Sequence, residues 1–323
     1  MIGLTYFPTE EPSPSQAAAF RELSSIREDW KLHSIEYSGT IKPNKSEISS
    51  YVPFEMGEQR ADSLWYPHAD IYAGVTKRGS RVTVGYFNGW TASEMIRHEC
   101  EFLLLLEKSD IAPRLEFCSP VSATMGVIAV DEIGVGVLHD LNQRKEMRYN
   151  LVETFYISIR MLEKVDRLLW EFGFLHPNLN LHSWNYRFIK SGYDAKNDDI
   201  VLSGFGKDTI FWPTAKRTAS LQSTPRNALM QIIENIALLF SGSDIAMTPR
   251  GEFQFISGHF GANDKTPFNP ITEFNLTKES YDEVYDNLRN VSSIYKNTDV
   301  YEIPNFQGVI SLLKRNIEIL ESA

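Results

Sequence analysis

The stretch GFLHPNLNLHSWNYRFI, residues 173–189, is followed at residues 200–206 by IVLSGFG. Both segments mix short apolar runs with turn-forming residues, and neither contains an aspartate or a glutamate. The polar positions of the first segment include Asn178, Asn180 and Asn185. An amide side chain cannot accept a proton at neutral pH, and a glycine side chain offers no ligand to a metal ion. These loops therefore contain no carboxylate that could act as a general base or bind a metal ion.

The composition of the chain is that of a folded globular protein. Of its 323 residues, 42% are hydrophobic and 23% are charged. A chain of this length can form one bilobal domain or two ordinary domains. The formal net charge of −10 disfavours general affinity for nucleic acid or for anionic membranes, because both ligands require a basic surface. We therefore expect neither nucleic acid nor a membrane among the partners.

The cysteine content and the N-terminus predict a cellular location. Cys100 and Cys118 are too few for a disulfide framework and lack metal-site spacing, so we interpret them as buried free thiols in a reducing compartment. Residues 1–16 contain no basic region followed by an apolar run, so no signal peptide is evident. No apolar run is long enough to span a bilayer. These features predict a soluble, cytoplasmic protein.

The first part of the chain is rich in predicted strands. Residues 69–75 (ADIYAGV) and 81–87 (RVTVGYF) predict two strands joined by a hairpin at residues 76–80. Thr91-Ala92-Ser93-Glu94 has the form of a capping box and predicts a helix that continues to about Glu107. Residues 15–29 predict a short amphipathic helix before these strands, and residues 39–50 predict a loop.

The second part is helical. Between Tyr149 and Phe172, apolar residues recur at spacings of three and four, which predicts a helix with one core-facing stripe. Thr224-Pro225 predicts the start of an apolar helix over residues 227–240. Two later helices are predicted at residues 278–290 and 305–321. Strands with one helix, followed by many helices, indicate an α+β protein of two lobes.

Several segments in this order resemble the protein kinase-like superfamily, from about Asp70 to Gly242 and on to the C-terminus. In the small lobe, DIYAGVTKRGSRVTVGYF (70–87) resembles two strands and RHECEFLLLL (97–106) resembles the helix, while Val135–Leu141 stands at the hinge. In the large lobe, LLWEFGFLH (168–176) resembles the end of a long helix and LLFSG (238–242) the end of a central helix. The resemblance implies a bilobal, protein kinase-like fold with a small β-rich N-lobe containing one helix and a larger helical C-lobe. It divides the chain into an N-terminal extension at 1–45, an N-lobe at 46–135, and a hinge and C-lobe at 136–323.

The resemblance also places the functional positions of the family. The third-strand lysine, which grips the nucleotide phosphates, falls on Gly85. Its acidic partner is retained as Glu99, with Glu101 as the weaker alternative. The magnesium-binding acid of the Asp-Phe-Gly motif becomes Gly204, and residues 55–70 contain one glycine where the family has three.

The catalytic loop can be aligned in two registers. In the first, residues 176–179 overlay His-Arg-Asp-Leu, so that Asn178 takes the place of the base and Ser183 that of the metal-binding Asn. In the second, residues 178–185 overlay the small-molecule-kinase form, so that Asn180 replaces the base and Asn185 is retained. The second register matches more residues. In both, the base carboxylate is replaced by an amide, and Trp184 takes a position that the family usually gives to a small residue. We therefore expect its indole to help fill or shield the space between the lobes.

These replacements predict a pseudokinase with no cofactor and no metal, acting as a scaffold or allosteric regulator of a protein partner such as an active kinase or another enzyme. One alternative is an atypical ATP-dependent phosphotransferase whose charged groups have moved, for example to Lys77, Lys207 or Asp208. Another is an unrelated α+β binding protein. The N-terminal extension before Asp70 and the polar insertion Lys190–Asp199 are the predicted docking surfaces.

Overall fold

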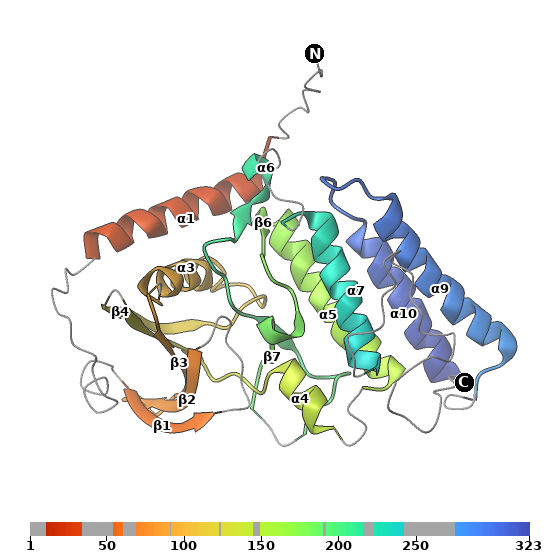
Figure 1. The fold of residues 1–323 in the computed structure, drawn as a ribbon, viewed down its shortest axis with the longest axis horizontal. Helices are drawn as coiled ribbons and strands as arrows, with labels where there is room; N and C mark the ends of the chain where they lie inside the picture. The colour runs from red at the N-terminus through yellow and green to blue at the C-terminus, as the bar shows by residue number, and fades with distance from the viewer. Residues whose placement is uncertain are drawn as a thin grey trace, which may run out of the picture.

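The apolar pattern builds two unequal lobes (Figure 1), seen in a computed structural model that describes residues 11–33, 54–60, 69–90, 92–122, 124–144, 149–189, 192–215, 223–241 and 275–323. The loop predicted at residues 39–50 lies outside these ranges. Within them, no helix combines the length and apolar composition that a bilayer-spanning segment needs.

The small lobe contains one antiparallel sheet with strand order β1-β2-β3-β5-β4. The strands are β1 (Phe54–Arg60), β2 (Ala69–Thr76), β3 (Arg81–Asn88), β4 (Leu115–Ser122) and β5 (Met125–Asp131). The predicted hairpin between β2 and β3 is confirmed, because the Thr76 N–H donates to the Ser80 carbonyl at 2.8 Å. Successive side chains of a strand point to opposite faces, so the sheet has two different faces.

One face of the sheet packs against helix α3 (Ala92–Leu105), which the capping-box pattern predicted. Phe87 of β3 shares the main core with Ile96 of α3, whereas Val82 and Val84 pack in a smaller cluster on the other face. The helix approaches so closely that a Cβ at Gly126 of β5 would lie 2.0 Å from Ile96 Cδ1. A side chain at this position would therefore require the Ile96 side chain to move.

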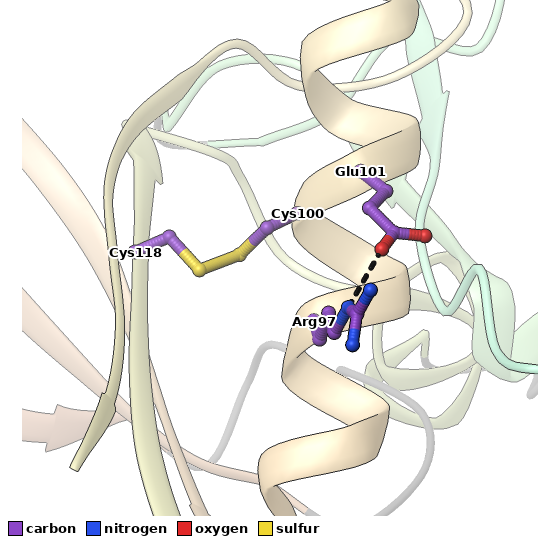
Figure 2. Close-up of a disulfide and its surroundings, with 4 residues drawn as sticks. All are labelled: Arg97, Cys100, Glu101 and Cys118. Atoms are coloured by element: carbon purple, nitrogen blue, oxygen red, sulfur yellow. Dashed lines mark hydrogen bonds and ion pairs between the residues drawn. A yellow bond between two sulfur atoms is a disulfide. The ribbon is translucent and has the colours of Figure 1, made fainter. Parts of the chain in front are cut away.

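Cys100 of α3 and Cys118 of β4 form a disulfide (Figure 2), with their Cα atoms 6.5 Å apart. The prediction of two free thiols is therefore wrong. The count and spacing of cysteines indicate frameworks and metal sites, but they do not reveal that a helix and a strand pack face to face. This packing brings the two sulfur atoms together across 18 residues of sequence.

The large lobe confirms the predicted helices: α5 (Leu151–Trp170), α7 (Pro225–Ser241), α9 (Lys278–Asn297) and α10 (Phe306–Ser322) lie side by side, and the short α4 (Val137–Gln143) precedes them (Figure 1). Asn150 and Glu153 form a capping box at the start of α5, a signal that the sequence interpretation missed. The segments between α5 and α7 form short elements: β6 (Phe174–Leu175), η1 (Leu181–Ser183), β7 (Trp184–Tyr186), β8 (Ile200–Leu202), β9 (Ile210–Phe211) and α6 (Trp212–Ala215).

Helix α1 (Pro14–His33), within the predicted N-terminal extension, packs against both lobes (Figure 1). Near its start, the Gln16 side-chain amide donates to the Leu169 carbonyl of α5 at 2.9 Å, and the Phe20 ring lies 4.6 Å from the Phe211 ring. Further along, the Arg27 guanidinium pairs with Glu101 of α3 at 2.8 Å. The helix therefore links the small lobe to the large lobe along one side of the molecule.

Glu101 is the charged centre of this link, and its side chain is fully buried. Burial alone would raise the pKa of its carboxyl group, but hydrogen bonds from His98, Arg27 and Arg97, with the charge of Arg27, outweigh burial and lower the pKa to about 2. The carboxylate therefore stays ionised at any physiological pH.

Replacing Glu101 by glutamine should lower the free energy of unfolding by about 2 kcal/mol at neutral pH, because charge-assisted hydrogen bonds to two arginines are lost. The folded pKa lies below the ordinary 4.5, so this contribution is complete above pH 4.5 and disappears as the pH falls towards 2. Urea unfolding of both proteins at several pH values measures the difference. The exposed Glu107→Gln is the matched control. A difference that does not shrink in acid would contradict this account.

Reduction of the Cys100–Cys118 disulfide should lower the free energy of unfolding by about 3 kcal/mol, since it releases a closed loop of moderate length in the unfolded chain. Guanidinium unfolding with and without a dithiol reductant measures the change. A Cys100→Ala/Cys118→Ala variant should not respond to the reductant. Equal stability of the oxidised and reduced wild type would refute the prediction.

Candidate functional site

The predicted site residues lie where the two lobes meet. Gly85 is buried in β3, on the face of the sheet that packs against α3, and pairs with Ile71 and Ile128. A glycine supplies no ammonium group at this position. Glu99 of α3 is only 3% exposed, and its Oε1 accepts a hydrogen bond from the Gly204 N–H at 3.0 Å. The retained carboxylate therefore holds the main chain of a large-lobe loop.

The two candidate base positions stabilise the loop between β6 and β7. Asn178 Oδ1 accepts a hydrogen bond from the Asn180 N–H at 3.2 Å, and Asn180 Oδ1 accepts one from the His182 N–H at 3.0 Å. The second interaction caps the short helix η1. Both amides are therefore used as acceptors for main-chain donors, which is a common role of asparagine in turns.

The two candidate metal positions lie beside the residue that precedes Gly204. The Asn185 amide donates to Ser203 Oγ at 3.3 Å, and the Ser183 carbonyl accepts from the Ser203 N–H at 2.9 Å. Asn185, Ser183 and Ser203 are all buried. The metal-binding position of either register, Ser183 or Asn185, therefore lies against Ser203, the residue that follows β8.

Gly204 itself has φ of +88°, a backbone conformation that glycine adopts more readily than other residues. Among the described residues, no group of three or more His, Cys, Asp or Glu side chains could hold a metal ion.

A chain of aromatic contacts connects the Gly204 loop to the rest of the fold. Phe205 stacks on Phe102 of α3 with ring centroids 5.5 Å apart and meets His176 edge-on at 4.9 Å. Phe102 contacts Phe174, which contacts Phe211 beneath α1. Burial lowers the pKa of His176 to about 4, so the imidazole is neutral at physiological pH. Its Nδ1 accepts a hydrogen bond from the Asn178 N–H.

Several main-chain groups of residues 132–136, which connect β5 to α4, also have partners within the protein. The Ile133 N–H donates to Thr83 Oγ1 at 3.0 Å, and the Ile133 carbonyl accepts from the Arg60 guanidinium at 2.8 Å. Arg60 comes from β1 and also reaches Thr83, at 3.4 Å. The guanidinium of Arg60, which comes from the edge strand β1, therefore binds the main chain that joins the lobes.

The rest of this connection is bound from the large-lobe side. The Gly134 N–H donates to the Tyr186 carbonyl at 2.8 Å, and the Val135 carbonyl accepts from the Tyr186 N–H at 2.9 Å. The Val135 N–H donates to the Tyr193 hydroxyl at 3.1 Å. A flat base between the lobes would need free donors and acceptors on this segment, and these five groups already have partners in the protein.

Neither Arg60 nor Tyr193 was singled out in the sequence interpretation. Arg60 stands in a polar stretch without a pattern, so nothing in the sequence indicates its target. Thr83 could have been noticed, because strand alternation places this small polar residue on the same face as Gly85. The predicted hinge, Val135–Leu141, becomes helical from Val137 onward.

Trp184 is fully buried at the start of β7. Its indole N–H donates to the Leu179 carbonyl at 3.1 Å, an acceptor that also receives the Asn235 amide at 2.6 Å. The indole thus packs inside the lobe and supports the main chain of the loop that contains the asparagines. That the indole fills or shields the space between the lobes stays a prediction, because its hydrogen bond lies within the large lobe.

The candidates for relocated charges are exposed. Lys77 lies in the turn between β2 and β3, while Lys207 and Asp208 follow Gly206. All three side chains have the exposure of ordinary surface charges.

Comparison with known proteins places the fold. No protein-family model and no curated protein matches the chain. Among solved structures, the chain is similar to vaccinia related kinase 3, with a TM-score of 0.51 over 94% of this chain and 96% of that chain, at 10% sequence identity. At this identity the likeness concerns the fold and not the activity. The chain therefore has the α+β protein kinase-like fold, with a five-stranded small lobe, its helix and a helical large lobe.

Proposed function

We propose that the chain is a catalytically inactive kinase-like protein that acts as a protein-binding scaffold or as an allosteric partner of an enzyme such as an active kinase. One observation carries the proposal: the interlobe positions that should hold phosphate and metal contain glycines and amides, and the retained acid is bonded to main chain. Glu99 binds the Gly204 N–H, and neither Gly85 nor Gly204 can supply a charge.

Enzymes that transfer phosphoryl groups work almost entirely by positioning the reactants and by stabilising charge in the transition state. Removing one such group typically costs about 3 kcal/mol of transition-state stabilisation. A chain without the lysine, the base and the metal ligand loses all three contributions, although these are not additive. The bonded segment at residues 132–136 further supports a role without nucleotide.

An atypical phosphotransferase remains the alternative reading. It requires Lys77, Lys207 or Asp208 to act at the junction, and all three are exposed ordinary charges. Of the two predicted docking surfaces, the described part of the insertion at 190–199 is held to the large lobe through Asp199, which pairs with Lys164 at 3.1 Å and with Arg187 at 2.9 Å.

Mg-ATP should not stabilise the protein. A ligand that binds only the folded state raises the unfolding temperature, so a thermal-shift titration to millimolar Mg-ATP should give a flat curve. Magnesium alone and ATP with a chelator serve as controls for ion effects. A saturable increase in unfolding temperature would show nucleotide binding and would favour the alternative function.

Restoring the missing acid at Gly204 should fail to create a magnesium site and should destabilise the fold. Aspartate at φ of +88° costs about 1 kcal/mol, so Gly204→Asp should lower the free energy of unfolding by that amount. Gly206→Asp is the matched control, because a Cβ there meets no atom within 4 Å and its φ is not positive. Magnesium-dependent stabilisation of the Gly204→Asp variant alone would show that the junction can still accept a metal.

A further inference from the structure

A cavity of about 620 Å³ lies on the small lobe where α1 passes the N-terminal half of α3. None of the interlobe positions described above lines this cavity, and neither the fold nor the proposed inactivity explains it. Its lining comes from α1, from the turn after β3 and from one side of α3: Arg27, Trp90, Ser93, Glu94, Arg97, His98 and Glu101.

Two arginines in this cavity are oriented by one buried acid. Arg27 gives its Nε to Glu101 Oε2 at 2.8 Å, and Arg97 gives its Nε to Glu101 Oε1 at 2.9 Å. Figure 2 shows the Arg97 guanidinium meeting the carboxylate to one side of α3, with the disulfide on the other. Each guanidinium has further donors on its two terminal nitrogens, and none of these donates to a described residue. The side chains are 38% and 41% exposed, so their outer edges reach the cavity.

Trp90 supplies an apolar surface beside these cations. Its side chain is 94% exposed, the highest value among the large hydrophobic residues in the described ranges. A single exposed apolar side chain is common on protein surfaces, but this indole lines the same cavity as the two arginines and could bury apolar surface of a ligand there. Tryptophan and arginine are also the residues that most often dominate the energetics of protein interfaces.

The remaining charges of the cavity are accounted for locally. His98 lies 3.4 Å from Glu101 through Nδ1 and 4.0 Å from Glu94 through Nε2. Glu94 is thus placed beside the imidazole, one turn from Arg97, and the terminal nitrogens of the arginines remain the main donors. Guanidinium groups fixed in place pair with carboxylates through parallel hydrogen bonds.

We propose that this cavity is a docking site for an acidic peptide segment of a protein partner, with carboxylates on Arg27 and Arg97 and one bulky apolar side chain on Trp90. The inference rests on the proposed binding function and specifies the surface and the partner chemistry. A small free anion would leave the Trp90 surface unused. Nucleic acid is disfavoured by the net charge of −10.

Selection from phage-displayed random dodecapeptides on the full chain, with counter-selection on Trp90→Ala, tests the proposal. Enriched sequences should contain at least two acidic residues next to a tryptophan, phenylalanine or leucine. A selection that yields no enrichment over the Trp90→Ala protein would overturn the proposal. So would one that yields neutral or basic sequences.

The best selected peptide, labelled for fluorescence anisotropy, gives the quantitative test. Trp90→Ala should weaken binding about tenfold and Arg27→Lys or Arg97→Lys about fivefold each, because lysine can still pair with Glu101 but loses the planar fork. Phe188→Ala and Arg289→Lys, which alter exposed residues of the large lobe, should leave Kd unchanged. Circular dichroism and urea unfolding check the fold of each variant.

A peptide with glutamine in place of each acid is the matched ligand control and should lose binding. Equal binding of that peptide would overturn the proposal. Complete displacement by inorganic phosphate without any effect of Trp90→Ala would assign a simple anion site instead. Stabilisation by Mg-ATP in a protein that still binds the peptide would favour the phosphotransferase alternative and leave the docking site standing, so failure of the proposed function is distinguishable from failure of the docking site.

Discussion

The fold depends on how one turn of α3 is attached to its surroundings. Three consecutive residues point in three directions: Glu99 accepts the Gly204 N–H of the large lobe, Cys100 is joined to β4, and Glu101 receives the arginine of α1. Each attachment uses a different kind of bond. Moving α3 would therefore disturb the sheet, the interlobe loop and the N-terminal helix together, which gives a small lobe that is fixed to the rest of the molecule.

Hydrogen bonds within the protein also determine the structure of the interlobe region. Groups that could have been offered to a ligand serve as internal partners: the asparagines cap main-chain turns, and Arg60 and Thr83 bind the connection between the lobes. Since unpaired buried polar groups are costly, a site without its ligand gains stability when the protein satisfies those groups itself. This reassignment gives the polar groups between the lobes partners within the protein.

Much of this architecture could be predicted from local pattern. Neighbouring residues alone predict the apolar stripes of α5 and α10 and the hairpin between β2 and β3. The order of these predicted elements along the chain indicated the fold. The sequence also shows directly that position 204 holds a glycine in place of an acid. What could not be predicted depends on contacts between distant segments, because neither the bonding of Arg60 to Ile133 nor the pairing of Cys100 with Cys118 leaves a mark in local sequence.

The covalent link between α3 and β4 makes the stability of the small lobe a function of its chemical surroundings. Thiol–disulfide equilibria follow the reduction potential of the compartment, and a glutathione-rich medium competes with an intramolecular bond. The same polypeptide would have a tighter helix attachment in an oxidising lumen than in a reducing one. The redox poise that the chain meets after synthesis therefore sets how firmly α3, and with it the α1 surface, is held.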